Sequence, residues 1–154
     1  MKKLNLNLSS LIIIILFTFS FSYSAEKNIV KGKAIIIDGD TIKIKGEKIR
    51  FGGIDAPERG EVGHQFSKKK LLEKLDKQII ICIKEKNKDY WKRTVAECFI
   101  KNESISSYMV KNGFACDYVK YSKRKYAKEQ KYAKNNKLGI WNMKFDPAWD
   151  KKCG

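Results

Sequence analysis

Histidine is nearly absent from this 154-residue chain, which contains a single one, His64. The four cysteines show no Cys-x-x-Cys spacing, so the clustered thiolate and imidazole ligands of a zinc site are missing. A lone histidine in the first turns of a helix is far more often structural or solvated than catalytic, and we assign His64 no chemical role. Internal repeats and linkers are also absent, and the length suits one domain with its own core.

Acidic residues are scarce beside basic ones. The chain has 17 Asp and Glu against 33 Lys and Arg, which gives a net charge of +16. Such an excess is typical of proteins that bind a polyanion, either nucleic acid or an anionic membrane surface. The alternative is a lysine-rich surface that is simply solvated, and charge alone does not decide between the two.

The N-terminus has the pattern of a secretory signal peptide. Lys2 and Lys3 form a basic start, and the uncharged apolar run Leu11–Phe21 follows. Small residues then stand at the spacing that signal peptidase requires, so we expect cleavage after Ser24. Residues 1–24 are therefore predicted to be a signal peptide.

An uncleaved anchor is the alternative interpretation of the same segment. Leu4–Ala25 carries no charge and approaches the roughly 20 residues that a membrane span requires. In that case a membrane would be a partner of the protein. In either case residues 25–154 form the functional domain, which we expect to be exported to a periplasm or secreted.

The chain has an even number of cysteines, and in an exported protein such a count favours disulfides. The four are Cys82, Cys98, Cys116 and Cys153. Cys82 and Cys98 each lie in a short apolar run that resembles a strand, and the two runs look like antiparallel neighbours. We therefore favour a Cys82–Cys98 bridge, which leaves Cys116–Cys153 to hold the C-terminal tail. The alternative is that Cys82 and Cys98 are reduced and buried as small apolar residues.

The rest of the chain is organised around residues 38–59. Two acidic turns, Asp38-Gly39-Asp40 and Asp55-Ala56-Pro57-Glu58, flank two short runs of alternating apolar residues. Gly46-Glu47 between the runs predicts a hairpin, and a hairpin brings its outer ends together. The gathered carboxylates would repel one another unless a cation lay among them. Oxygen ligands without histidine or cysteine indicate Ca²⁺ or Mg²⁺.

This stretch resembles the staphylococcal nuclease (thermonuclease) family, whose mark is an Asp-Gly-Asp-Thr turn followed by Arg and then Asp-Ala/Thr-Pro-Glu. Three further motifs of the family follow in its order: Arg93-Thr94-Val95-Ala96, Met109-Val110-Lys111-Asn112-Gly113-Phe114-Ala115 and Leu138-Gly139-Ile140-Trp141. Together the motifs span about residues 35–141. A single motif would be weak evidence, but four in the right order form a specific match.

The sequence predicts five strands and three helices, an α+β chain that is mainly β. The expected strands are 29–37, the two arms of the hairpin, 79–83 and 94–99, and the expected helices are 61–75, 104–113 and 122–136. Tyr126 and Ala133 are expected to face the core, and Trp141, Phe145 and Trp149 to close the bottom of the domain. The resemblance implies that the strands form a five-stranded Greek-key OB-fold barrel, a fold that commonly binds oligonucleotides.

The resemblance also implies a Ca²⁺-dependent nuclease that cuts DNA and RNA and leaves a 3′-phosphate. One Ca²⁺ ion would be held by Asp40, Asp55 and the backbone carbonyl of Ala56. Pro57 would help by keeping Ala56 extended. Glu58 is the candidate general base on the attacking water.

Two arginines, Arg50 and Arg93, would clamp the phosphate, because each presents paired donors to two oxygens. One departure from the family lies beside Arg93. Lys92 replaces a glycine that supplies a special backbone conformation, so the presentation of Arg93 is open. Each of these residues also has a structural interpretation, as a surface ion pair or a turn former.

Aromatic residues complete the candidate site. Tyr90 and Trp91 lie in a charged connection between two strands, and aromatic faces stack on bases while Lys and Arg contact phosphate. Tyr118 and Tyr121 would line a nucleotide groove or simply pack against the core. DNA and RNA are the expected partners of a monomer that needs no other protein. The alternative function is a non-catalytic nucleic-acid-binding OB module of the cell envelope, or a basic structural protein there.

Overall fold

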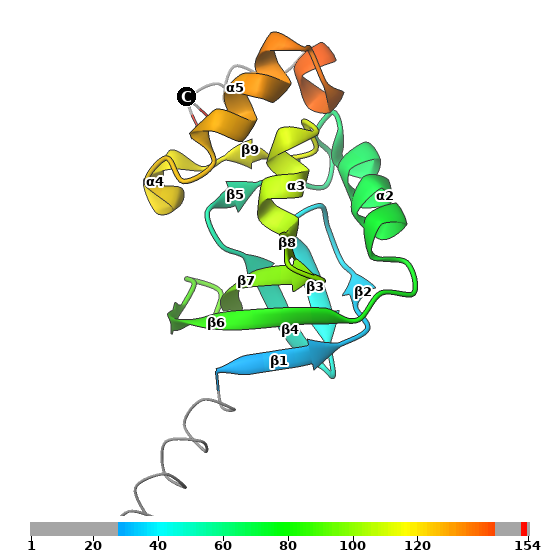
Figure 1. Cartoon of the computed structure of the whole chain (residues 1–154), viewed down its shortest axis with the longest axis vertical. Coiled ribbons are helices and arrows are strands. Elements are labelled where there is room, and N and C mark those ends of the chain that lie inside the picture. The colour runs from blue at the N-terminus through cyan, green and yellow to red at the C-terminus, as the bar shows by residue number, and fades with distance from the viewer. Residues whose placement is uncertain (1–27, 144–151, 154) are drawn as a thin grey trace, which may run out of the picture.

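The computed structural model describes residues 28–143 and 152–153 (Figure 1). The expected signal peptide, Phe145 and Trp149 lie outside these residues. Among the helices that are described, none has the length and apolar character needed to cross a membrane.

A curled mixed sheet forms one half of the molecule, and helices cover its upper side (Figure 1). Its main path runs β1-β6-β7-β4-β3-β2, with β8 added beside β7. The strands are β1 (Ile29–Gly32), β2 (Ile35–Ile36), β3 (Thr41–Ile44), β4 (Glu47–Phe51), β6 (Ile80–Lys88), β7 (Thr94–Ile100) and β8 (Glu103–Ser104). A separate pair consists of β5 (Ile54–Asp55) and β9 (Cys116–Asp117). The α+β class and the OB-like half-barrel are thereby confirmed.

The strand predicted over residues 29–37 is divided in two. β1 pairs with β6, whereas β2 pairs with β3, so the two ends of the sheet path belong to one short stretch of chain. This arrangement curls the sheet on itself. Gly32, at the end of β1, lies so close to β3 that an added Cβ would be 2.9 Å from Ile44 Cγ2. The prediction missed the division because residues 33–34 carry no strong turn signal.

The predicted hairpin is present, but its turn lies one residue earlier than expected. Ile44 pairs with Glu47, and the two turn residues are Lys45 and Gly46. Their φ angles of 49° and 88° are both positive, as the favoured two-residue hairpin turn requires. The alternating residues of the two arms are fully buried: Ile42, Ile44, Ile49 and Phe51. The alternation thus places one face of the hairpin in the core.

The first two long helices follow the prediction closely. Helix α2 is His64–Leu75, which begins three residues later than expected because Gly63 adopts the left-handed conformation, with φ of 90°. Helix α3 is Ile105–Lys111, and its N-cap Ser104 accepts a hydrogen bond from the N–H of Ser107. Gly113 ends this segment with φ of 68°, as predicted.

The last predicted helix, residues 122–136, is wrong at its start. One turn, α4 (Val119–Ser122), comes first, and α5 (Ala127–Asn135) follows. Lys123 and Arg124 between them have positive φ angles of 53° and 67°, which no α-helix accommodates. A short 3₁₀ helix, Gly139–Asn142, follows α5. Tyr126 and Ala133 are buried as expected, and Trp141 packs against a small cluster of buried residues.

All four cysteines are paired in the pattern that the sequence favoured. Cys82 and Cys98 are direct partners across β6 and β7, with Cα atoms 4.0 Å apart. Cys116 in β9 bonds to Cys153 with a Cα separation of 5.6 Å. The second bridge therefore holds Cys153 against β9.

Candidate active site

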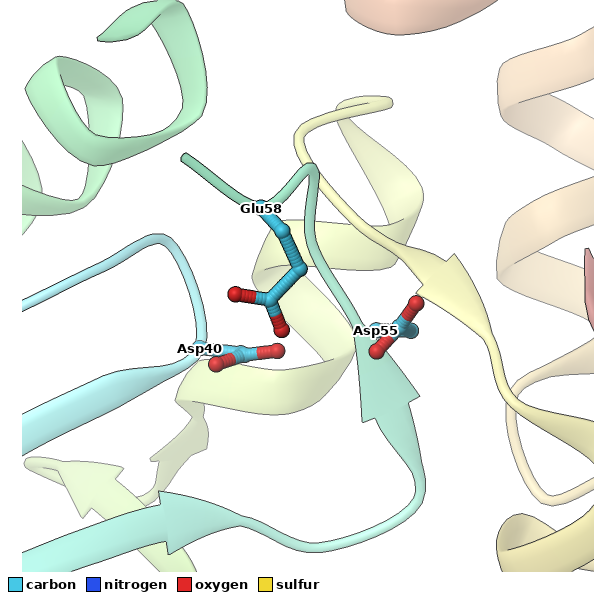
Figure 2. A group of neighbouring side chains, drawn as sticks. All are labelled: Asp40, Asp55 and Glu58. Atoms are coloured by element: carbon cyan, nitrogen blue, oxygen red, sulfur yellow. The ribbon is translucent and has the colours of Figure 1, made fainter. Parts of the chain in front are cut away.

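Three carboxylates from separate segments converge at one end of the sheet. Asp40 directly precedes β3, Asp55 ends β5, and Glu58 lies in the loop that follows (Figure 2). One carboxylate oxygen from each side chain lies within 4.8 Å of those of the other two. Asp40 and Asp55 are buried, while Glu58 is exposed. The two acidic turns thus meet as the hairpin predicts.

Local hydrogen bonds fix the orientation of Asp40. Its Oδ1 accepts from the hydroxyl of Thr41 at 2.8 Å, and its Oδ2 accepts from the N–H of Ala56 at 3.2 Å. Ala56, the residue expected to offer a carbonyl oxygen, therefore lies beside the cluster and is buried there. Gly39 permits this approach, because an added Cβ would lie 2.7 Å from Ala56 Cβ.

Asp38 takes no part in the cluster, although it belongs to the first acidic turn. Its Oδ1 lies 3.0 Å from Nε2 of His64, which is buried at the start of α2. His64 therefore ties the turn to the helix, in keeping with its expected structural role. The chain bends at residues 38–40, so the two aspartates do not share one face as residues i and i+2 of an extended strand would.

Burial and charge repulsion act together on the carboxylates. Burial, and then the negative charge of Asp40, raises the pKa of Asp55 above its ordinary value. Burial likewise raises the pKa of Glu58, with contributions from Asp40 and Asp55. A bound cation would relieve this repulsion. The donor set contains oxygen only, which fits a hard cation such as Ca²⁺ or Mg²⁺.

Arg50 spans the two buried carboxylates. Its Nη1 donates to Asp40 Oδ2 at 2.6 Å, and its Nη2 donates to Asp55 Oδ1 at 2.8 Å. Nη2 also donates to the carbonyl of Ile54 at 3.2 Å. The guanidinium is thus held at the cluster by strand β4, with only 13% of its side chain exposed.

Arg93 reaches the same region from the start of β7. Its Nε donates to Asp89 Oδ2 at 2.6 Å, and its backbone N–H donates to Asp89 Oδ1 at 2.8 Å. Its guanidinium lies 4.9 Å from the ring centroid of Trp91. Lys92 has a φ of 59°, so the lysine itself adopts the conformation that glycine favours. The departure from the family pattern thus leaves Arg93 anchored by Asp89.

A cleft of about 630 Å³ opens over Asp55, Glu58 and the two arginines. Eight of the residues proposed from the sequence line it: Arg50, Asp55, Glu58, Tyr90, Trp91, Arg93, Tyr118 and Tyr121. Tyr90 and Trp91 are 90% and 71% exposed. Tyr118 and Tyr121 meet edge to face with ring centroids 4.9 Å apart. Two aromatic pairs from distant segments therefore border one cleft.

One cationic residue of this cleft was not predicted from the sequence. Lys152 lines it, and its Nζ lies 3.5 Å from Asp55 Oδ2. One of many lysines, it carries no motif of its own. The position of Cys153 next to it was the available signal, because the favoured bridge to Cys116 draws this part of the chain toward β9.

Comparison with known proteins agrees with this geometry. The family described as "Staphylococcal nuclease homologue" matches residues 48–143. An "Uncharacterized endonuclease" of Haemophilus influenzae is 35% identical over 81% of this chain and 74% of its own length. The "Succinoglycan biosynthesis protein ExoI" of Rhizobium meliloti is 30% identical over 80% of this chain and 70% of its own.

A plant relative, the "Probable staphylococcal-like nuclease CAN4" of Oryza sativa, is 31% identical over 77% of this chain and 25% of its own length. The family match over residues 48–143 contains Asp55, Glu58 and both arginines. With the half-barrel and this cleft, the match shows that the chain belongs to the staphylococcal nuclease family.

Proposed function

We propose that this protein is a Ca²⁺-dependent nuclease that hydrolyses DNA and RNA. The observation that carries the proposal is a cluster of three carboxylates, two of which line one cleft together with two arginines. The family match and the relatives named as nucleases support the same activity.

Asp40, Asp55 and the carbonyl of Ala56 are the residues proposed to hold one Ca²⁺ ion. The two carboxylates are buried and close together, which suits a cation that prefers several oxygen ligands. When bound, the ion would supply a Lewis acid for a phosphate oxygen. Ala56 serves as well as threonine here, because the backbone carbonyl is the proposed ligand.

Glu58 is proposed to accept the proton of the attacking water. Its side chain points toward Asp40 and Asp55 but remains exposed to the cleft, where water has access (Figure 2). A general base must lie within hydrogen-bond reach of the proton that it removes. Attack in line with the 5′-oxygen would leave a 3′-phosphate and a free 5′-hydroxyl.

Arg50 and Arg93 are proposed to bind the phosphate oxygens on which negative charge develops. Preorganised donors are most effective where charge appears in the transition state. Arg93 is preorganised by Asp89, and Arg50 by the two buried carboxylates. Each guanidinium offers paired donors that match two oxygens.

Substrate binding is proposed to draw on Tyr90, Trp91, Tyr118 and Tyr121, together with the positive charge of the chain. The aromatic faces would stack on bases or sugars of a single strand. The two disulfides fit an oxidising compartment, in agreement with export after removal of residues 1–24.

End-group analysis tests the proposed reaction. Purified protein is incubated with 5′-labelled single-stranded DNA or RNA in the presence of Ca²⁺, and the products are treated with a 3′-phosphatase. We expect both polymers to be cut and the products to shift in mobility after phosphatase treatment. Products that already carry a 3′-hydroxyl would contradict the reaction, and binding without cleavage would favour the non-catalytic module.

A further inference from the structure

Lys152 brings a further positive charge to the cleft from the far end of the chain. It lines the cleft together with Arg50, Lys88 and Arg93. Its Nζ lies 3.5 Å from Asp55 Oδ2, which is long for an ion pair, and 40% of its side chain is exposed. Its ammonium group therefore keeps N–H donors that a ligand in the cleft could use.

The position of Lys152 is fixed through its neighbour Cys153. Cys153 is fully buried and bonds to Cys116, and Cys116 is the direct partner of Asp55 across β5 and β9. The bridge thus ends beside the very residue that Lys152 contacts. Lysine has a long flexible side chain, so a fixed backbone is needed to keep its charge at one place.

Gln130 of helix α5 forms a second tie. Its Oε1 accepts from the N–H of Asp117 at 2.7 Å, and its Nε2 donates to the carbonyl of Cys153 at 2.5 Å. Gln130 is itself buried. Cys153 is therefore held to β9 by a covalent bond and a side-chain bridge, both of which keep the adjacent Lys152 at the cleft.

We propose that Lys152 is a substrate-binding residue that contacts the phosphate backbone of single-stranded nucleic acid, and that the Cys116–Cys153 disulfide holds it at the cleft. The proposal rests on the proposed function, because it takes nucleic acid as the ligand of the cleft. A strand bound by Arg50 and Arg93 carries further phosphates on either side, and Lys152 supplies a cation for one of them.

A purely structural role for Lys152 makes a different prediction. If its charge served only to offset Asp55, its loss would change stability or metal affinity but not the number of phosphates contacted. The salt dependence of DNA affinity counts those phosphates. When the logarithm of the binding constant is plotted against the logarithm of the salt concentration, the slope has a magnitude of about 0.7 for each phosphate contacted on a single strand. The slope therefore separates substrate binding from charge compensation.

The test measures the affinity of a fluorescent single-stranded oligodeoxynucleotide by anisotropy over a range of KCl concentrations, in chelator so that no cleavage occurs. For Lys152→Met we expect the slope to fall by about 0.7 and affinity at 0.1 M salt to fall roughly 5-fold. Lys152→Arg should keep the slope of the parent. Lys69→Met, which removes an exposed lysine of α2 outside the cleft, is the matched control and should also keep it.

The disulfide is tested with the double variant Cys116→Ser/Cys153→Ser, which retains the Cys82–Cys98 bridge. We expect the same loss of slope, and we expect no further loss when Lys152→Met is added, because the bridge acts through that lysine. Circular dichroism checks that the double variant is folded. If it is not, the Lys152 variants decide the binding role, since they keep both bridges.

The outcomes separate this proposal from the proposed function. If the parent cleaves DNA with Ca²⁺ but Lys152→Met binds with the slope of the parent, the role of Lys152 is wrong and the nuclease stands. If Lys152→Met loses slope but the parent never cleaves, Lys152 stands as a binding residue and the nuclease fails. If the parent neither binds nor cleaves, both fail. Additive losses in the triple variant would overturn the role of the disulfide.

Discussion

Arg50 donates a 2.6 Å hydrogen bond to Asp40, so a residue proposed to bind phosphate is paired with one proposed to bind metal. A second bond, to Asp55, extends the pairing to the other buried carboxylate. Any cation that binds these two side chains must share them with the guanidinium. Phosphate binding and metal binding are therefore expected to be coupled. A phosphate would give Arg50 a replacement partner, and a metal ion would give the two carboxylates one.

Replacing Arg50 should make the fold depend on metal. Arg50→Met removes the guanidinium that bridges the two buried carboxylates, and breaking a buried ion pair typically costs about 3–5 kcal/mol. We expect a lower melting temperature in chelator and a larger rise on addition of Ca²⁺ than in the parent. Scanning calorimetry measures both, with Lys48→Met on the exposed side of β4 as the control. If Ca²⁺ raised the melting temperature of Arg50→Met and of the parent equally, that result would contradict the coupling.

Replacing Glu58 should separate chemistry from binding. Glu58→Gln keeps the size of the side chain but removes its basicity, and loss of a general base typically lowers the rate about 10²- to 10⁴-fold. Oligonucleotide affinity should stay within a few-fold of the parent, because the exposed carboxylate repels phosphate rather than binding it. Single-turnover cleavage and equilibrium binding are measured on the same protein, with Glu73→Gln on α2 as the control. Unchanged cleavage would exclude Glu58 as the base.

Much of the site followed from local patterns of the sequence. The alternation of Ile42, Ile44, Ile49 and Phe51 fixed the hairpin, and the hairpin brought the two acidic turns together. Cys82 and Cys98 could be paired because both lie in apolar runs of adjacent strands. These features depend on neighbours in sequence or on one strand pair, where periodicity is informative.

Other features depend on contacts that no local pattern specifies. Lys123 and Arg124 are good helix formers, yet both take positive φ angles and divide the predicted helix. No local pattern predicts that Asp38 contacts His64 of α2. Lys152 is brought to the cleft by a disulfide and by Gln130, far away in the sequence. In each case the arrangement depends on contacts between segments that are distant in the sequence.

The Cys82–Cys98 bridge should contribute to stability. The bridged residues are 16 apart, and closing a loop of this length contributes about 3 kcal/mol. Because both side chains are buried, Cys82→Ala/Cys98→Ala should unfold at lower denaturant concentration. Peptide mapping without reduction should recover Cys82 linked to Cys98. A peptide that links Cys82 to Cys153 instead would overturn both the pairing and the strand order.

Tyr126 should make the fold sensitive to alkali. Burial, together with its hydrogen bond to Glu97, raises the pKa of Tyr126 from 10.0 to about 12. The unfolded chain therefore loses this proton at a lower pH than the folded chain, so stability falls as pH rises from about 10 to 12. Denaturant unfolding at pH 9 and 11.5 should show a smaller loss in Tyr126→Phe than in the parent. Tyr132→Phe, at a half-exposed tyrosine of α5, should lose as much as the parent.

We propose that the carboxylate cluster is a Ca²⁺ site on which cleavage depends. The most direct measurement is the initial rate of cleavage of single-stranded DNA by purified protein as free Ca²⁺ is raised from chelator-buffered zero, compared with Asp40→Ala. We expect no cleavage in chelator, full recovery with Ca²⁺, and a half-maximal concentration shifted upward in Asp40→Ala because a buried ligand is lost. Full activity of the parent in chelator would contradict the account.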